Sequence, residues 1–418
     1  MVGVGIRPAG GGGGRGLTYL DHAATSWPKP DAVGAAMLRA MEYAGGNPGR
    51  AGHLLSVRAS ETVYAARECA ASFFGLSRPE NVLFYPNATY AINAVLHGLA
   101  LSGKEVLYSE LEHNAVLRPL EALRREAGVT GVCYPVFGEG GKLLSDAQIL
   151  AGIRARITRD TALVCACHAS NVCTAVLPLA RIGALCRAAG VPLLADVSQS
   201  AGAYDIRMER DGISYLCTAG HKGLLGPAGS GLLLIAPDAA MPRSFVQGGN
   251  GVHSLSPAMP DFLPEGLEAG TLSVPAIAGL AAGMETLCRI GTQAVRAREH
   301  EATQRLAEML WSMPGVSVHG ADGFGTVLSF SVRDVPCAVC AARLAEAGIC
   351  VRAGFHCAPG VHRALGTELG GTVRVSPGWN TDASDTERFY RAMHEMLCGR
   401  LTASPCAAGQ IKRQARNR

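Results

Sequence analysis

Short apolar runs alternate with helix-like segments along this chain, and that alternation constrains the fold more than any other feature. Residues 82–85 form one such run, and a polar turn follows at residues 87–89. Apolar residues then recur at helical spacing, at Ile92, Val95, Leu96 and Leu99. The same order of strand, turn and helix repeats along the chain. The sequence therefore predicts an α/β fold with a mostly parallel central sheet flanked by helices.

Polar residues follow several of the apolar runs at the point where each predicted strand ends. They are Glu112 and His113 after residues 106–108, His168 and Asn171 after 162–166, Asp196 after 191–195, and His221 and Lys222 after 215–218. In open α/β sheets, ligands bind outside the carboxyl ends of the strands. We therefore expect these polar residues to converge on one crevice.

The helix expected after Thr89 could bind an anion at its start, where unpaired backbone N–H groups and the positive end of the helix dipole are presented. An ordinary helix cap by Asn87 or Thr89 is the alternative, and the local sequence does not separate the two. The chain has no Walker A motif and no dinucleotide fingerprint. Residues 248–251 form only a glycine-rich turn without a strand and helix around it. Nucleotide binding is therefore not expected.

Length and composition narrow the class of protein. The 418 residues suit two domains or one large α/β unit, and no apolar run reaches the length of a membrane-spanning helix. Residues 1–16 carry a glycine run and no apolar signal segment, so we expect a flexible arm there. The formal net charge is +4, and the basic tail at 401–418 is interpreted as a solvated end. Binding to nucleic acid or to a membrane is not expected.

Fourteen cysteines could form disulfides, but the chain has enough apolar material to fold without them, and a reducing cytoplasmic location fits better. Cys337 and Cys340 have the spacing of a metal or redox pair, and Cys165 and Cys167 are closer still. No second pair follows at the distance of a zinc site. Core packing is therefore favoured over metal binding, and no metal is expected.

Residues 352–359 place one thiol, Cys357, beside the imidazole of His356 and near the guanidinium of Arg352. The thiolate is the attacking form of cysteine, and positive neighbours favour it, so Cys357 is a candidate nucleophile. Adjacency in sequence does not establish contact, and any one of fourteen cysteines is otherwise a small core residue. The interpretation of Cys357 as a nucleophile therefore depends on other motifs in the chain.

Taken together, the short motifs resemble those of one enzyme family in type and in order. They lie at residues 19–24, 47–53, 87–89, 112–114, 170–171, 196–199, 220–222, 268–271 and 356–358, and at Arg374. The order is that of the class V aminotransferase-fold cysteine desulfurases, and the chain resembles their group II, selenocysteine-lyase-like branch. The resemblance covers roughly residues 17 to 400 and is specific as a set, although each motif is short.

The resemblance implies the fold-type I architecture of enzymes that use pyridoxal phosphate (PLP). A large PLP-binding domain is expected at 17–282, and its first residues would join the small domain. A smaller α+β domain carrying Cys357 and Arg374 is expected at 283–400. The family also implies a homodimer whose active site is complete only when both subunits are present.

The resemblance further implies a role for each residue around the cofactor. Lys222, otherwise an ordinary surface charge, would bind PLP through its amine and later act as a base. Asp196 would pair with the pyridinium nitrogen, and His113 would stack on the ring and help to move protons. The other expected contacts are Asn171 and Gln199 to the phenolic oxygen, and Ala88, Thr89, His221 and the partner subunit's Thr271 to the phosphate.

For the substrate, the resemblance implies L-cysteine or L-selenocysteine. Arg374 would bind the carboxylate through paired donors, with Asn171 and His53 nearby. On its own, an arginine between two valines is more typical of the solvent face of a strand. Cys357 would take the sulfur as a persulfide and leave L-alanine. A thiol reductant, or an acceptor protein in iron–sulfur cluster or thio-cofactor assembly, would then remove the sulfur.

Two positions depart from the family pattern. Ala219 stands where the family usually has serine or threonine, and Asn87-Ala88-Thr89 replaces the commoner Gly-Thr-Thr turn. Each change removes a hydroxyl group from the expected phosphate site, which concerns the affinity for the cofactor more than its identity. The alternatives are a selenocysteine lyase, a class V aminotransferase or isopenicillin-epimerase-like enzyme in which Cys357 is incidental, and a thiol-rich redox or metal-binding protein without PLP.

Overall fold

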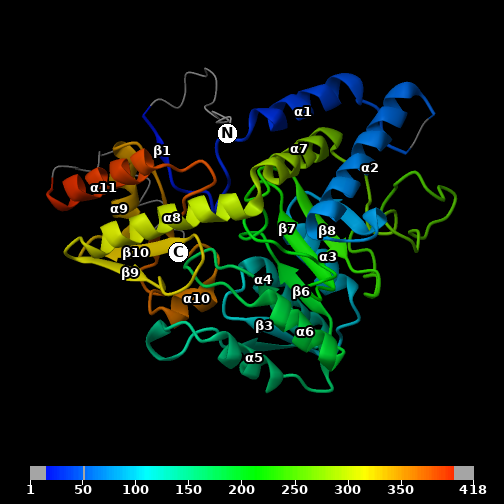
Figure 1. Cartoon of the computed structure of the whole chain (residues 1–418). Helices are drawn as coiled ribbons and strands as arrows, with labels where there is room; N and C mark the ends of the chain where they lie inside the picture. The colour runs from blue at the N-terminus through cyan, green and yellow to red at the C-terminus, as the bar shows by residue number, and fades with distance from the viewer. Residues whose placement is uncertain (1–15, 50–51, 400–418) are drawn as a thin grey trace.

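The structure, a computed structural model, describes residues 16–49 and 52–399 and is built on two main sheets (Figure 1). The larger sheet has the strand order β2-β8-β7-β6-β5-β3-β4. Its strands are β2 (Val82–Tyr85), β3 (Glu105–Ser109), β4 (Thr130–Tyr134), β5 (Thr161–Cys167), β6 (Leu193–Asp196), β7 (Tyr215–Ala219) and β8 (Gly231–Ile235). The strands from β4 to β7 run parallel, and β8 is antiparallel to both of its neighbours, β2 and β7. The predicted α/β fold with a mostly parallel sheet is confirmed.

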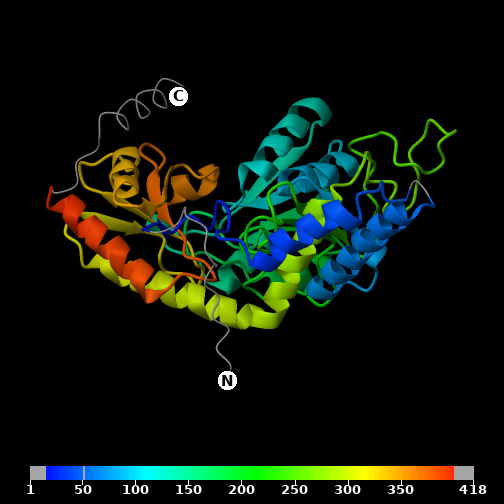
Figure 2. The same ribbon diagram turned by 90° about the horizontal axis from the view of Figure 1, so that it is seen from above.

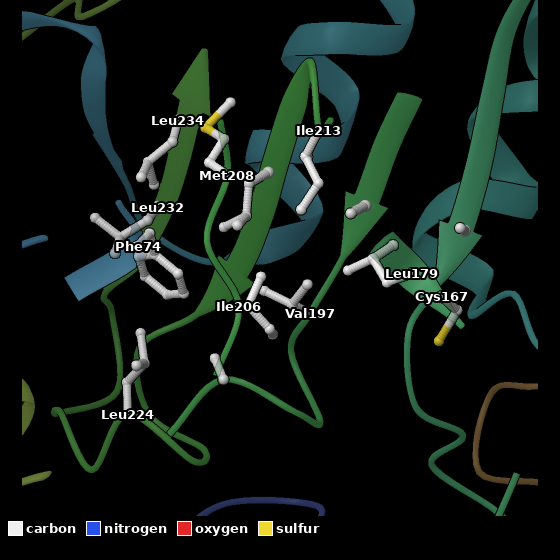
Figure 3. Packing of buried hydrophobic residues seen from close by; sticks show 14 of the residues in the cluster. Phe74, Cys167, Leu179, Val197, Ile206, Met208, Ile213, Leu224, Leu232 and Leu234 are labelled. Atoms are coloured by element: carbon white, nitrogen blue, oxygen red, sulfur yellow. The ribbon is translucent and has the colours of Figure 1, made fainter. Parts of the chain in front are cut away.

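Helices cover both faces of this sheet. One face packs against α3 (Ala88–Gly98) and α4 (Asn114–Ala127). The other packs against α2 (Leu54–Phe74), α5 (Asp146–Arg154), α6 (Leu179–Ala189) and α7 (Val274–Ile290), and α1 (Asp31–Tyr43) lies on α7. Figure 3 shows part of this second core, including Ile206, Met208 and Leu232. Burial on both faces explains why the strands read as continuous apolar runs.

The smaller sheet is antiparallel, with the order β12-β13-β10-β9. Its strands are β9 (Val316–His319), β10 (Leu328–Val332), β12 (Arg352–Gly354) and β13 (Thr372–Val375). The helices of this part are α8 (Thr292–Trp311), α9 (Cys337–Glu346), α10 (Pro359–Ala364) and α11 (Ala383–Leu397). Figure 2 shows α8 and α11 side by side along this part of the molecule.

The N-terminal strand β1 (Thr18–Tyr19) pairs in parallel with β11 (Ile349–Cys350), so the start of the described chain joins its last third. Two short 3-10 helices occupy Pro79–Asn81 and Glu139–Gly141.

The expected division at residue 282 falls inside α7, and as a domain boundary it stays a prediction. Nearly all of the expected arm and the whole basic tail lie outside the described residues. Within the described ranges, no helix is both long and apolar enough to cross a bilayer.

Local caps fix the turns from strand to helix. At the start of α3, the side-chain oxygen of Asn87 accepts a hydrogen bond from the backbone N–H of Tyr90 at 3.1 Å. At the start of α4, Nδ1 of His113 accepts one from the N–H of Ala115 at 3.0 Å. Gly128 ends α4 with φ 66°, a left-handed conformation that glycine adopts without strain. These residues therefore set where α3 and α4 start and where α4 ends beside the sheet.

A buried ion pair ties α2 to the edge of the large sheet. Arg67 and Glu268 are 5% and 8% exposed, and Nη2 of Arg67 donates to Oε2 of Glu268. Nη1 of Arg67 also donates to the carbonyl of Val82, and Oε1 of Glu268 accepts from the N–H of Phe84 at 2.7 Å. Each charge therefore has its partner and a backbone contact, which a buried pair needs to offset its lost hydration.

Glu268→Ala should lower the free energy of unfolding by about 3–5 kcal/mol, because it leaves the Arg67 guanidinium buried without its counter-charge. Urea denaturation would measure the change. The matched control is Glu301→Ala, which breaks the exposed pair with Arg305 on α8 and should change stability by at most about 1 kcal/mol. Equal effects of the two substitutions would contradict a structural role for the buried pair.

Candidate active site

The carboxyl ends of four neighbouring parallel strands, β3, β5, β6 and β7, meet at one edge of the large sheet. Asp196 is the last residue of β6, and Lys222 comes shortly after the end of β7. His113 follows β3 in the same way, and Asn171 follows β5. The topology of the sheet therefore brings these four residues to the same edge, as parallel strands do in open α/β folds.

Lys222 is partly buried, and its amine has no partner among the described residues. Loss of hydration lowers the pKa of Lys222, the nearby positive charge of Arg374 lowers it further, and the negative charge of Asp196 acts in the opposite direction. No hydrogen bond or ion pair joins its amine to the residues described by the structure. A lysine in this setting gives up its proton more readily than one in water, so it can serve as a nucleophilic amine or a base.

Two histidines beside Lys222 are held neutral. Burial is the main cause that lowers the pKa of His113, and its Nδ1 already accepts the helix-cap hydrogen bond, which leaves the ring face and Nε2 for other contacts. Burial also lowers the pKa of His221 to about 4, and the positive charges of Lys222 and Lys29 add to this effect. Both are therefore uncharged imidazoles at neutral pH.

Arg374 is one of the most deeply buried side chains in the molecule, with only 1% of its surface exposed. Its Nη2 donates to Oδ1 of Asp21 at 2.6 Å, and its Nη1 donates to the carbonyl of Asn171 at 3.1 Å. Its Nε is buried without a partner in the described part of the chain. Arg374 is therefore not on the solvent face of its strand, the alternative that the Val-Arg-Val pattern left open.

The loop that carries Cys357 is fastened to the same edge of the sheet. The carbonyl of Cys357 accepts a hydrogen bond from the N–H of Asn114 at 2.8 Å, and the carbonyl of His356 accepts one from Nδ2 of Asn171. His356 and Cys357 have φ values of 50° and 61°, which few residues other than glycine adopt. The strained backbone is held by these contacts, and the Cys357 side chain stays partly exposed.

His356 does not provide positive charge to the Cys357 thiol. Its side chain is 5% exposed, and burial, followed by the charge of Arg374, lowers the pKa of His356 to about 2. Its Nε2 lies 3.2 Å from the hydroxyl of Thr372, within the small sheet. Of His356 and Arg352, the two neighbours of Cys357 considered from the sequence, only the exposed Arg352 brings positive charge to this part of the site.

The start of α3 lies beside the end of β7, because Gly231 of β8 pairs with both Tyr85 and Ala219. Asn87 uses its side chain for the N–H of Tyr90, as in an ordinary helix cap. The N–H groups of Ala88 and Thr89 have no acceptor among the described residues. The cap and an anion-binding role are therefore compatible, because they use different N–H groups.

Three other expected site residues have distinct surroundings. Gln199 lines a small cavity of about 30 Å³ together with Lys222, and its Nε2 donates to the carbonyl of Ala23 at 2.9 Å. Thr271 is exposed and lines a separate hollow of about 240 Å³ with Tyr90 of its own chain. His53 is exposed, and its Nδ1 caps α2 by accepting from the N–H of Ser56 at 3.3 Å. The roles of all three stay predictions.

Two carboxylates at the site received no role from the sequence. Asp21 holds Arg374, and although it belongs to one of the motifs, nothing in the sequence pairs the two residues. Glu112 is fully buried, and Oε1 of Glu112 accepts from the hydroxyl of Ser109 at 2.7 Å and from the N–H of Cys167 at 2.8 Å. Burial raises the pKa of Glu112 to about 7. In the sequence, the only indication that Glu112 belongs to the site was its position directly before His113 in an apolar setting.

Comparison with known proteins links the chain to one family. The family model for aminotransferase class-V matches residues 18–389. A probable cysteine desulfurase of Pseudomonas aeruginosa is 36% identical over 394 residues, which cover 91% of this chain and 94% of that protein. A probable cysteine desulfurase of Mycolicibacterium paratuberculosis is 31% identical over 395 residues. The match covers 92% of this chain but only 56% of that longer protein.

Solved structures give the same relationship. The apo cysteine desulfurase of Thermococcus onnurineus NA1 superposes with a TM-score of 0.83 at 28% identity, over 92% of this chain and 95% of that one. The cysteine desulfurase CsdA of Escherichia coli, in an S-sulfonic acid form, superposes with a TM-score of 0.82 at 27% identity, over 93% and 96% of the two chains. The likeness therefore extends through both sheets.

Histidines that are buried in the neutral form near the site should each lower the free energy of unfolding as the pH falls below about 6. Burial lowers the pKa of His168 from 6.5 to about 4, so as pH falls through this window the unfolded chain takes up the proton first. Each such histidine contributes a loss of up to about 1.4 kcal/mol per pH unit between these values. His168→Asn, which can keep the contact with Ser200, should flatten the decline of unfolding free energy measured from pH 7 to pH 4.

His394→Asn makes the same substitution at an exposed position of α11 and is the matched control for this measurement. An unchanged slope in the His168→Asn variant would contradict the assignment of a buried neutral imidazole.

Proposed function

The chain belongs to the class-V aminotransferase family, and we propose that it is a PLP-dependent cysteine desulfurase. In the proposed reaction, L-cysteine becomes L-alanine and its sulfur passes to Cys357 as a persulfide. The observation that supports this most is the position of the Cys357 loop, which Asn171 and the start of α4 hold at the edge of the sheet that carries Lys222. A thiol held there serves sulfur transfer, whereas ordinary transamination does not need it.

The residues at this edge fit PLP by their chemistry. The amine of Lys222 is unpaired, the N–H groups of Ala88 and Thr89 are free, and Oδ1 of Asn171 is buried without a donor in the described part of the chain. Amine, anion-binding N–H groups and an unsatisfied amide are the kinds of group that an aldehyde-bearing phosphate ester with a phenolic oxygen would engage.

We assign the cofactor contacts accordingly. When bound, PLP would supply an electron sink for the α-carbon of an amino acid. Lys222 would hold it covalently, Asp196 would pair with its ring nitrogen, and the neutral His113 ring would stack on it. The remaining contacts would come from Asn171 and Gln199 at the phenolic oxygen, and from Ala88, Thr89, His221 and Thr271 of the partner subunit at the phosphate.

The missing hydroxyl at Ala219 is not replaced by its neighbour. Side chains alternate along β7, so Cys217 packs with the core on the α3 and α4 side, and Thr218 faces the opposite way. Thr218 is 0% exposed, and its hydroxyl has no partner among the described residues. The phosphate would therefore depend more on the backbone N–H groups of the α3 start than the family pattern implies.

In the proposed mechanism, the chain's own residues bind the substrate and move protons and sulfur. Arg374 would bind the α-carboxylate, and the free amine of Lys222 would take the α-proton. The thiolate of Cys357 would attack the substrate sulfur, so that an S–S bond forms while the substrate's C–S bond breaks. The electron pair of that bond stays with the substrate carbon, which then takes up a proton to give L-alanine.

The proposed partners follow from the same chemistry. A persulfide on Cys357 has to be discharged by a thiol reductant or by a sulfur-acceptor protein, and such thiol chemistry suits the reducing cytoplasm. A homodimer is proposed because apolar side chains are exposed near Thr271. They include Tyr90 and Val246, which are 46% and 45% exposed and line the same hollow as Thr271.

Purified protein supplied with PLP and L-cysteine should release L-alanine and carry one added sulfur on the peptide that contains Cys357. Cys357→Ser should lower the rate of alanine formation by about a hundredfold or more, because no thiolate is left to take the sulfur. Amino-acid analysis and peptide mass spectrometry would measure both. Cys288→Ser, which changes another exposed thiol, is the matched control and should leave both unchanged.

Absence of alanine with either L-cysteine or L-selenocysteine would contradict the proposed activity. If Cys357→Ser loses activity with L-cysteine but keeps it with L-selenocysteine, selenocysteine lyase becomes the better assignment, because selenium release depends less on the protein thiol.

Lys222→Ala should remove the visible absorbance that PLP gives when it is bound covalently to the protein, because the variant lacks the amine that would form the bond. The absorbance spectrum of the protein after removal of free PLP would measure this. Lys104→Ala, at an exposed lysine near Asp160, is the control and should keep the band. An unchanged spectrum in Lys222→Ala would place the cofactor on another lysine.

A further inference from the structure

Arg374, the proposed receptor for the substrate carboxylate, already holds a carboxylate of its own chain. Nη2 of Arg374 lies 2.6 Å from Oδ1 of Asp21, and the side chains of Arg374 and Asp21 are 2% and 20% exposed. The pair joins residues that are 353 positions apart in the sequence. The guanidinium is thus charge-compensated before any substrate arrives, as a buried cation needs to be.

Asp21 cannot move away from Arg374 easily, because backbone hydrogen bonds fix it on both sides. The N–H of Ser376 donates to the carbonyl of Leu20 at 2.8 Å, and the N–H of His22 donates to the carbonyl of Ser376 at 3.1 Å. The N–H of Ala23 donates to the hydroxyl of Ser376 at 2.9 Å. Asp21 therefore forms a parallel β-bridge with Ser376, directly after the end of β13, and its carboxylate is held against Arg374.

The guanidinium still has donors for a second carboxylate. The contacts to Asp21 and to the carbonyl of Asn171 use one N–H each from Nη2 and Nη1. The Nε–H is buried without a partner in the described part of the chain. A substrate carboxylate bound to the remaining donors would share one cation with Asp21. Two carboxylates at one guanidinium repel each other, and partial burial strengthens that repulsion.

We propose that Asp21 is a positioning residue that limits the affinity of the site for amino acids with a free α-carboxylate. It orients Arg374 and opposes a substrate carboxylate at Arg374 by like-charge repulsion. This inference rests on the proposed function in one respect, which is that Arg374 receives the α-carboxylate of the substrate.

The test is calorimetric titration of the PLP-loaded protein with L-alanine and with L-alaninamide, which has a neutral amide in place of the carboxylate. Asp21→Asn should tighten the binding of L-alanine by about fivefold, because it removes the repelling charge and keeps the shape of the side chain. The affinity for L-alaninamide should change by less than about twofold. Asp21→Glu keeps the charge and extends it toward the free donors, so it should weaken the binding of L-alanine.

Asp205→Asn is the matched control, because Asp205 also pairs with arginines, Arg207 and Arg210, but on an exposed surface. It should leave both affinities unchanged. The proposal is overturned if Asp21→Asn fails to tighten L-alanine, if it tightens both ligands equally, or if Asn and Glu shift L-alanine affinity in the same direction. If Asp21→Asn does not fold, the Asp21→Glu variant decides: weaker binding of L-alanine alone supports the proposal, and unchanged binding overturns it.

The titration also separates this proposal from the proposed function. Binding of L-alanine needs no turnover and no thiol, so the effect of Asp21 can be measured even if the protein releases no alanine from L-cysteine. With L-cysteine as substrate, Asp21→Asn should lower KM and change kcat little, since the residue acts on the bound carboxylate rather than on the reacting sulfur.

Discussion

The buried guanidinium of Arg374 is the interaction on which the arrangement of the site depends. It joins β13 to Asp21 in the N-terminal segment and to the carbonyl of Asn171, which follows β5 of the large sheet. The side chain of Asn171 in turn holds the loop of Cys357. A buried cation needs partners for its charge and its N–H donors. Moving any of these segments would leave Arg374 buried without one of its partners, which costs several kcal/mol. The two sheets are therefore locked together at the point where the chemistry is proposed.

Burial also sets the electrostatic character of the site. It lowers the pKa of His113, His221 and His356, so these imidazoles stay neutral and leave the positive charge to the arginines and to Lys222. The pKa of Lys222 is itself lowered by burial and raised only in part by Asp196. An amine that loses its proton readily, beside a carboxylate and fixed guanidinium groups, can both bind an anionic amino acid and accept a proton from it.

The sequence predicted the sheet and its functional edge well, because both depend on local patterns. Apolar runs and the polar residues that end them gave the strands, and the parallel topology then brought Asp196, Lys222 and Asn171 to one edge. Long-range contacts could not be read in this way. The pattern around Arg374 looked like a solvent face because the segment that covers it comes from the other end of the chain. His356 looked like a neighbour of the thiol, but the left-handed backbone turns its ring toward Thr372.

Glu112 shows how a residue outside the catalytic chemistry can still shape the site. Its carboxyl is fully buried, and the hydrogen bonds from Ser109 and Cys167 do not outweigh the lost hydration, so the pKa of Glu112 rises to about 7. The negative charge of Asp196 raises it further. Burial therefore favours the protonated form of Glu112 and reduces the negative charge beside Asp196.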